Sequence, residues 1–123
     1  MLVNLLSHLS NSQRAYHKSF MFPNVGFCTS ILDILWDQGI IKGYSRLDNG
    51  TLLVYLLYSE GYPQIKHVRV LSKPTQRVYA SRLDLARLSG SVGVIIVSTT
   101  RGILTLETAL KLGLGGEILA YLE

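Results

Sequence analysis

The chain has 123 residues, of which 48% are hydrophobic and 16% are charged, with a formal net charge of +4. This composition excludes a disordered polyelectrolyte, and the single cysteine excludes a disulfide framework or a zinc site built from cysteines. The longest stretch without a charged residue, Ser19 to Leu32, is shorter than the roughly 20 apolar residues of a membrane span. We therefore expect a soluble protein without a membrane partner, and Met1–Gln13 lacks the features of a secretory signal.

The charge is distributed unevenly along the chain. Residues 1–61 carry four basic and four acidic residues, whereas residues 62–123 carry eight basic and four acidic residues. The whole net charge therefore lies in the second half. Spaced basic residues can form an ordinary solvated surface, but they also suit an anionic partner that meets the second half of the chain.

The first half of the chain predicts the element order α-β-α-β-β. Leucines recur at helical spacing between Leu2 and Leu9, and the short polar residues that follow favour the end of that helix. Asn49 and Gly50 suit a type I′ turn between two strands, because both residues tolerate positive φ. In chain order we expect a helix over 2–9, a strand over 16–22, a helix over 27–38, and strands over 41–48 and 51–58.

The second half predicts short strands interrupted by two short helices. The continuous apolar run Val94–Val97 is typical of a strand that is buried on both faces. Ser81 can cap one helix with help from Asp84, and Gly113 can end another. We expect strands over 65–71, 77–79, 94–97, 103–105 and 117–122, and helices over 81–88 and 106–112.

Together these elements predict an α+β fold of two small domains, an N-terminal α-β-α-β-β domain and a C-terminal strand-rich domain with short helices. The turn-rich stretch at 60–63 places the domains at residues 1–62 and 63–123. A domain of about 60 residues buries only about 60% of the surface of its unfolded chain, so each half is marginally stable alone. A binding partner would then supply part of the stability.

The residues that could carry catalysis are too scattered to form a site. The three histidines lie far apart without ligand-spaced carboxylates, and Cys28 belongs to an apolar helical pattern with no basic neighbour to activate it. Gly113–Gly116 follows a predicted helix instead of preceding one, which argues against a nucleotide-binding loop. We therefore expect no enzyme, no metal site and no cofactor.

One loop combines groups that suit RNA. The apolar strand at 94–97 leads into Ser98–Gly102, where no nearby base could activate a hydroxyl nucleophile. The loop can be a plain turn, yet its hydroxyls, backbone N–H groups and single cation also suit RNA 2′-hydroxyls and phosphates. Arg77 and Tyr79 alternate on an extended segment and would share one face, as in strands that bind nucleic acid.

Three segments and one residue carry a recognisable pattern. Val94–Thr105 holds a hydrophobic strand, a hydroxyl loop that ends in Arg-Gly, and a second strand. Ser72–Tyr79 follows the pattern Ser-Arg/Lys-Pro-x-x-Arg-x-Tyr, and Gly113–Leu119 is a Gly-rich turn before a strand that starts with Glu. Asn11 falls where an Arg-Asn pair would stand. In order and spacing these features resemble the universal family of the eighth protein of the small ribosomal subunit.

The resemblance implies a structural constituent of the small ribosomal subunit that supports translation. Such a protein binds small-subunit rRNA directly, helps to nucleate assembly of the central domain, contacts neighbouring ribosomal proteins and takes no small-molecule substrate. It also implies that residues 63–123 form the main rRNA-binding domain. The RNA-binding residues implied by the resemblance are Asn11, Lys73, Arg77, Tyr79, Ser98, Thr99, Thr100, Arg101, Gly102, Gly115, Gly116 and Glu117.

The chain departs from bacterial members of that family at its start. Val3–Leu9 replaces the usual Asp-Pro-Ile-Ala-Asp-Met-Leu pattern, and Ser10 stands where the family has an arginine before its asparagine. The leucine-rich opening and the low lysine content are more similar to mitochondrial members, so we expect a mitochondrial ribosome, with the bacterial cytoplasm or a plastid as the alternative. The alternative function is a small non-ribosomal RNA-binding domain or a regulatory domain that binds a metabolite.

Overall fold

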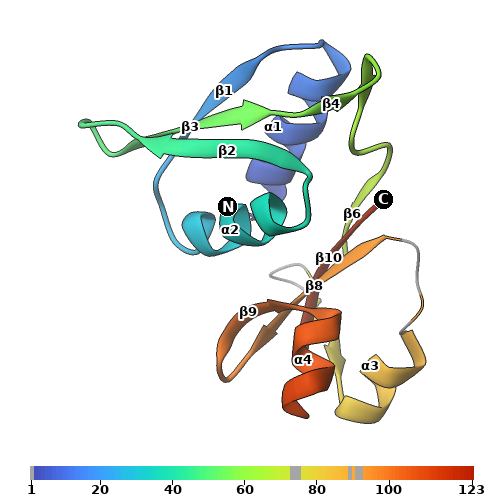
Figure 1. Cartoon of the computed structure of the whole chain (residues 1–123). Coiled ribbons are helices and arrows are strands. Elements are labelled where there is room, and N and C mark those ends of the chain that lie inside the picture. Colours follow the sequence, from blue (N-terminus) through green and yellow to red (C-terminus); the bar gives the residue numbers. More distant parts are fainter. Residues whose placement is uncertain (1, 73–75, 89, 91–92) are drawn as a thin grey trace. The chain divides into compact units, whose positions relative to one another are not determined.

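The computed structural model describes residues 2–72, 76–88, 90 and 93–123 (Figure 1). Its contacts divide the chain into two compact units, Met1–His67 and Val68–Glu123. Both units combine helices with antiparallel strands. The predicted α+β fold of two small domains is confirmed.

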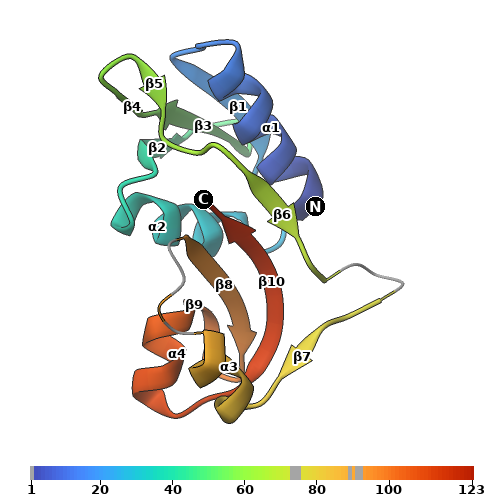
Figure 2. The same ribbon diagram turned by 90° about the vertical axis from the view of Figure 1, so that its right-hand side faces the viewer.

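The first unit is a three-stranded sheet with two helices and a short ribbon. Strands β1, β3 and β2 are antiparallel and lie in that order, while β4 and β5 form a separate two-stranded ribbon (Figure 2). The elements are α1 (Leu2–Arg14), β1 (Ser19–Pro23), α2 (Cys28–Asp37), β2 (Ile41–Arg46), β3 (Thr51–Leu56), β4 (Tyr58–Ser59) and β5 (Tyr62–Pro63).

One face of the first sheet forms the core of this unit with the two helices. Side chains alternate between the two faces of a strand; in β1, Phe20 and Phe22 are buried whereas Met21 between them is 62% exposed. On the helices, Leu5 and Leu9 of α1 and Ile31 and Leu35 of α2 are also buried. The helices therefore cover the buried face, as the helical spacing of these residues predicts.

The first helix ends later than the sequence predicts. The polar stretch predicted to end it contains Ser12, which is buried together with Gln13, and α1 continues to Arg14. Tyr16 then adopts a φ of 57°, and the N–H groups of Tyr16 and His17 donate to the carbonyls of Gln13 and Ser12. This is a Schellman-type ending with tyrosine at the position where glycine is usual. Burial overrides the local preference of short polar residues, and the following strand starts later than predicted for the same reason.

The predicted hairpin of β2 and β3 is confirmed, but its turn type is not. Only Gly50 has a positive φ, of 75°, so the Asn-Gly pair does not form a type I′ turn. The N–H of Leu47 donates to the carbonyl of Thr51, and the N–H of Gly50 donates to the carbonyl of Leu47. These bonds form a tight turn that ends in a left-handed glycine. The positive φ values that a type I′ turn requires occur instead at Glu60–Gly61, between β4 and β5.

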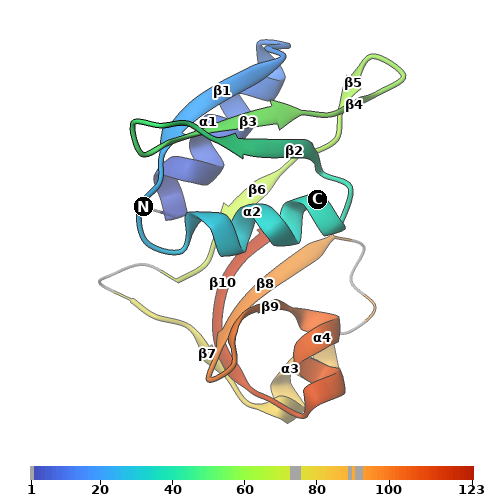
Figure 3. The same cartoon turned by 60° about the vertical axis from the view of Figure 1, so that its left-hand side comes forward.

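The second unit is a sheet with β10 near its middle. The strand order is β6-β10-β8-β9, and β7 also pairs with β10, whose register shifts between Ile118 and Ala120. The strand predicted over 65–71 is confined to three residues. The elements are β6 (Val68–Val70), β7 (Tyr79–Ala80), α3 (Arg82–Leu88), β8 (Val94–Thr99), β9 (Gly102–Thr105), α4 (Leu106–Leu112) and β10 (Gly116–Leu122), shown in Figure 3.

The helix caps of the second unit agree with the sequence. The hydroxyl of Ser81 accepts from the N–H of Asp84, and the carboxylate of Asp84 accepts from the N–H and the hydroxyl of Ser81. This reciprocal arrangement satisfies donors that a helix start leaves unpaired. Thr105 caps α4, and Gly113 ends it with a φ of 70°.

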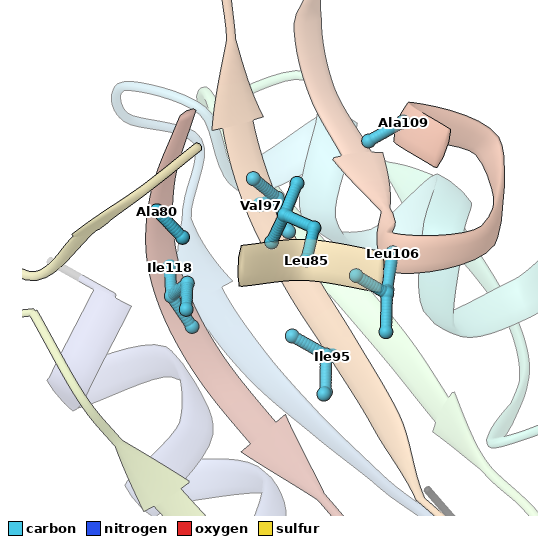
Figure 4. Packing of buried hydrophobic residues seen from close by; sticks show 7 residues of the cluster. All are labelled: Ala80, Leu85, Ile95, Val97, Leu106, Ala109 and Ile118. Atoms are coloured by element: carbon cyan, nitrogen blue, oxygen red, sulfur yellow. The ribbon is translucent and has the colours of Figure 1, made fainter. Parts of the chain in front are cut away.

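A small apolar cluster holds the sheet of the second unit to its helices (Figure 4). Leu85 of α3 has no exposed surface and lies between Val97 of β8 and Leu106 of α4. The cluster therefore joins both helices to the strand that leads into the hydroxyl loop. Its members are Ala80, Leu85, Ile95, Val97, Leu106, Ala109 and Ile118.

Candidate nucleic-acid interface

The predicted hydroxyl loop is the turn of the β8–β9 hairpin. The two strands pair until Thr99 meets Gly102, which leaves Thr100 and Arg101 in the turn. The Oγ1 atom of Thr99 accepts a hydrogen bond from the N–H of Arg101 (3.1 Å) and donates one to the carbonyl of Gly102 (2.9 Å). Thr99 therefore locks the turn from within, by the local bonding that threonine side chains offer to the backbone.

The locked turn presents its two central residues to solvent. Thr100 and Arg101 are exposed, and within the part of the chain that the structure describes, no ion pair engages Arg101. Gly102 has a φ of 109°, a left-handed value that glycine adopts without steric cost. The turn thus offers a hydroxyl and an unneutralised cation at adjacent positions, which suits a ribose 2′-hydroxyl and a phosphate.

A polar row crosses the sheet beside this turn. Tyr79 of β7 is the register partner of Glu117 of β10, and Glu117 is the register partner of Ser98 of β8. Paired residues in adjacent strands share a face of the sheet. The Nη1 atom of Arg77 donates to both carboxylate oxygens of Glu117, at 3.2 and 3.3 Å. The structure therefore brings Arg77, Tyr79, Ser98 and Glu117 together, as a shared interface requires.

The Arg77–Glu117 ion pair is more important for geometry than for stability. The side chain of Arg77 is 56% exposed, and exposed ion pairs contribute only about 0–1 kcal/mol. The pair holds the guanidinium at Glu117, the register partner of Tyr79, and offsets its charge. Among the described candidate residues, Arg101 is therefore the cation left free for an anionic partner.

Gly115 and Gly116 have no room for a side chain. A Cβ atom on Gly115 would lie 2.7 Å from the carbonyl oxygen of Ala80, and one on Gly116 would overlap the carbonyl oxygen of Ser98. Both obstacles are backbone atoms, which cannot swing aside. These glycines allow the start of β10 to pack closely against β8 and against the chain before α3. Of the two, Gly116 is the one that packs against the hydroxyl loop, at Ser98 and Thr99.

Known proteins match this chain almost from end to end. The family described as "Ribosomal protein S8" matches residues 1–122. The small ribosomal subunit protein uS8 of Rhizorhabdus wittichii is 41% identical over 122 residues, which cover 97% of this chain and 93% of that protein. Small ribosomal subunit protein uS8c of Rhodomonas salina is 34% identical over 126 residues, which cover 98% of this chain and 96% of that protein. The uS8 protein of Desulforudis audaxviator is 32% identical over 125 residues, which cover 98% of this chain and 95% of that protein. The chain belongs to the ribosomal protein S8 family.

Membership of this family confirms the predicted resemblance and decides between the functional classes. A ribosomal protein S8 is a structural component of the ribosome and not an enzyme. In the described residues, no group of three or more His, Cys, Asp or Glu side chains is placed to hold a metal ion. No described helix is both long and apolar enough to cross a membrane.

The structure does not bring two of the predicted site residues, Asn11 and Lys73, together with the others. Asn11 is exposed on α1 and belongs to the first unit, whereas the hydroxyl loop and the polar row belong to the second. Lys73 is not among the described residues. Both remain predictions that rest on the family pattern.

Sequence reasoning missed the role of Ser72 in this region. Its Oγ atom accepts a hydrogen bond from the N–H of Val78 at 2.9 Å, which closes the chain between the end of β6 and the start of β7. The closure places Arg77, the residue before Val78, beside β10. A serine before a Pro-containing segment is a signal for such local bonding, but it does not identify the partner six residues away.

Two pKa shifts in the structure have local causes. Hydrogen bonds from the N–H and hydroxyl of Ser81 lower the pKa of Asp84, so its carboxylate stays charged at the start of α3. In the first unit, the hydroxyl of Tyr44 donates to the carboxylate of Asp33 at 2.6 Å, and this bond raises the pKa of Tyr44. Neither group lies in the hydroxyl loop.

Proposed function

We propose that this chain binds small-subunit rRNA directly through its second unit, helps to nucleate assembly of the central domain, and contacts neighbouring small-subunit proteins. The observation that carries the proposal is the locked hydroxyl turn, in which Thr99 holds Thr100 and Arg101 exposed at fixed positions. Family membership supports the same function. The turn is the centre of the proposed interface.

The proposed contacts are of two kinds: some bind phosphates through charge, and others recognise the shape of the RNA surface. Arg101, with Lys73, supplies positive charge, and release of counterions from RNA makes such contacts strong and dependent on salt. Arg77, whose charge Glu117 offsets, contributes hydrogen-bond donors. Ser98, Thr100 and the ring of Tyr79 recognise an irregular RNA surface through 2′-hydroxyls and unstacked bases. Thr99, Gly102, Gly115, Gly116 and Glu117 act mainly by placing those groups.

We infer further that the ribosome is a mitochondrial one. The leucine-rich opening, the low lysine content and Ser10 in place of the family arginine support this inference. The relatives named above include bacterial uS8 proteins and one uS8c, so a bacterial or plastid ribosome is the alternative. The compartment from which the chain sediments with ribosomal subunits distinguishes these locations.

Replacing Arg101 with alanine is expected to weaken binding to a transcript of the rRNA central domain by about 1–3 kcal/mol, because it removes a charge-assisted contact. Thr99→Val is expected to weaken it by about 1 kcal/mol, because the turn loses its internal bonds. A filter-binding assay measures both. Lys111→Ala, which removes an exposed cation from α4, is the control and should leave the affinity close to that of the wild type. Unchanged affinity for Arg101→Ala and Thr99→Val would refute the assigned site.

A further inference from the structure

The second helix of the first unit presents an exposed tryptophan beside strand β2 (Figure 3). Trp36, near the end of α2, is 51% exposed. Its ring lies over Gly43 of β2, where an added Cβ atom would come 3.5 Å from the indole. The ring also meets Tyr44 edge-on, with ring centroids 6.0 Å apart and planes at 73°. Strand β2 therefore supports one side of the indole and leaves the rest of the residue accessible.

Two carboxylates lie beside this tryptophan on α2. Asp33 and Asp37 are exposed, and α2 contains no lysine or arginine. Within the described residues, neither carboxylate takes part in an ion pair. The hydroxyl of Tyr44 donates to Oδ1 of Asp33 at 2.6 Å, which leaves the second carboxylate oxygen able to accept from a partner. These four residues, Asp33, Trp36, Asp37 and Tyr44, are here called the α2 surface.

The negative charges of the α2 surface do not stabilise the helix that carries them. Like charges four residues apart on a helix repel each other, and Asp37 in the last turn meets the negative end of the helix dipole. The bond to Asp33 raises the pKa of Tyr44 and nearby Arg46 partly opposes that effect, so Arg46 offsets only part of the Asp33 charge. A cationic partner would therefore relieve a repulsion that the fold itself leaves in place.

An exposed indole beside carboxylates suits an arginine side chain. The guanidinium group stacks on aromatic faces, and its planar set of donors matches a carboxylate. Lysine is a poorer fit, because its ammonium group is a compact and strongly hydrated charge. RNA is a poorer fit as well, since Asp33 and Asp37 would repel its phosphates. The chemistry of the surface therefore favours a basic protein segment.

We propose that the α2 surface docks an arginine-containing segment of a neighbouring protein, with a guanidinium stacked on Trp36 and hydrogen-bonded to Asp33 or Asp37. This inference rests on the proposed contacts with neighbouring small-subunit proteins and assigns one of them a surface. Because Gly43 and Tyr44 already support the indole, little side-chain freedom is lost when the partner binds.

The test measures binding of the full chain to a short fluorescein-labelled peptide of alternating glycine and arginine by anisotropy. Asp37→Asn should weaken binding about threefold, and Trp36→Ala should weaken it about fourfold. Asp48→Asn is the matched control, because it removes the same charge from the exposed turn between β2 and β3. It should leave the affinity unchanged. Urea denaturation checks folding, and Asp37→Asn should be at least as stable as the wild type because it removes a helix-end repulsion.

Trp36 supplies an independent readout, because it is the one tryptophan of the chain. Its fluorescence emission should change when the unlabelled glycine-arginine peptide is added, and it should stay constant with a peptide of alternating glycine and glutamate. A glycine-lysine peptide should bind more weakly than the glycine-arginine peptide. Failure of the wild type to bind, constant Trp36 emission, or equal effects of Asp37→Asn and Asp48→Asn would overturn the inference.

Two other occupants give distinct results. Binding of a fluorescein-labelled oligouridylate that Trp36→Ala weakens to the same extent would overturn the inference in favour of RNA. Dimerisation in sedimentation equilibrium that Trp36→Ala abolishes would overturn it in favour of a second copy of this chain. The peptide assay contains no RNA, so the inference can fail while Arg101→Ala still weakens binding to the rRNA transcript, which tests the proposed function.

Discussion

Replacing Gly116 with valine is expected to lower the free energy of unfolding by about 3 kcal/mol and to weaken rRNA binding. Even the first added carbon would overlap the carbonyl oxygen of Ser98 and lie 3.3 Å from the Cα of Thr99. Since both are backbone atoms, β10 and β8 would have to separate where the hydroxyl loop begins. Urea denaturation measures the change in stability, and filter binding measures the change in affinity.

The control for this substitution is a glycine that is needed for its backbone angle alone. Gly50 has a φ of 75°, and a Cβ atom added there would have no neighbour within 4 Å, so Gly50→Ala should cost only about 1 kcal/mol through backbone strain. A Gly116→Val protein that is as stable as Gly50→Ala would show that close packing of β10 on β8 does not support the site.

Leu85→Ala is expected to destabilise the second unit by about 3 kcal/mol. Leu85 is fully buried in the apolar cluster, and truncation of a buried leucine leaves a cavity as well as removing its transfer free energy. The helix that carries it, α3, has only seven residues. Isolated helices of that length are unstable, so α3 depends on the packing of Leu85 to stay on the sheet.

The same helix provides a matched comparison. Leu83 is 70% exposed on α3, so Leu83→Ala removes the same atoms from a site that water already reaches. Its effect on urea denaturation should lie within about 0.5 kcal/mol of zero. Equal losses of stability for Leu83→Ala and Leu85→Ala would contradict the assignment of the core.

The sequence predicted best the elements that local chemistry specifies. The helix over 106–112 is reproduced because Thr105 and Gly113 satisfy its two ends, and Ser81 with Asp84 starts the helix before it. Predictions failed where tertiary burial decides. The first helix passes through Ser12 because that residue is buried, and no local pattern reveals this.

For the candidate site, too, the sequence predicted the local features but not the contacts between distant segments. The position of the hydroxyl loop followed from the apolar strand before it, and its exposed turn was predictable. The ion pair of Arg77 with Glu117 joins residues 40 positions apart in sequence, so it depends on the register of β10.

Sedimentation of the tagged chain from its own cells tests the central claim most directly. In a gradient that separates ribosomal subunits, the chain should migrate with the small subunit and shift to the top after ribonuclease treatment. Fractionation of the cells beforehand should place those subunits in mitochondria. Recovery of the chain only as a free monomer, with no fraction bound to small subunits, would contradict the assignment of this chain as an rRNA-binding component of the ribosome.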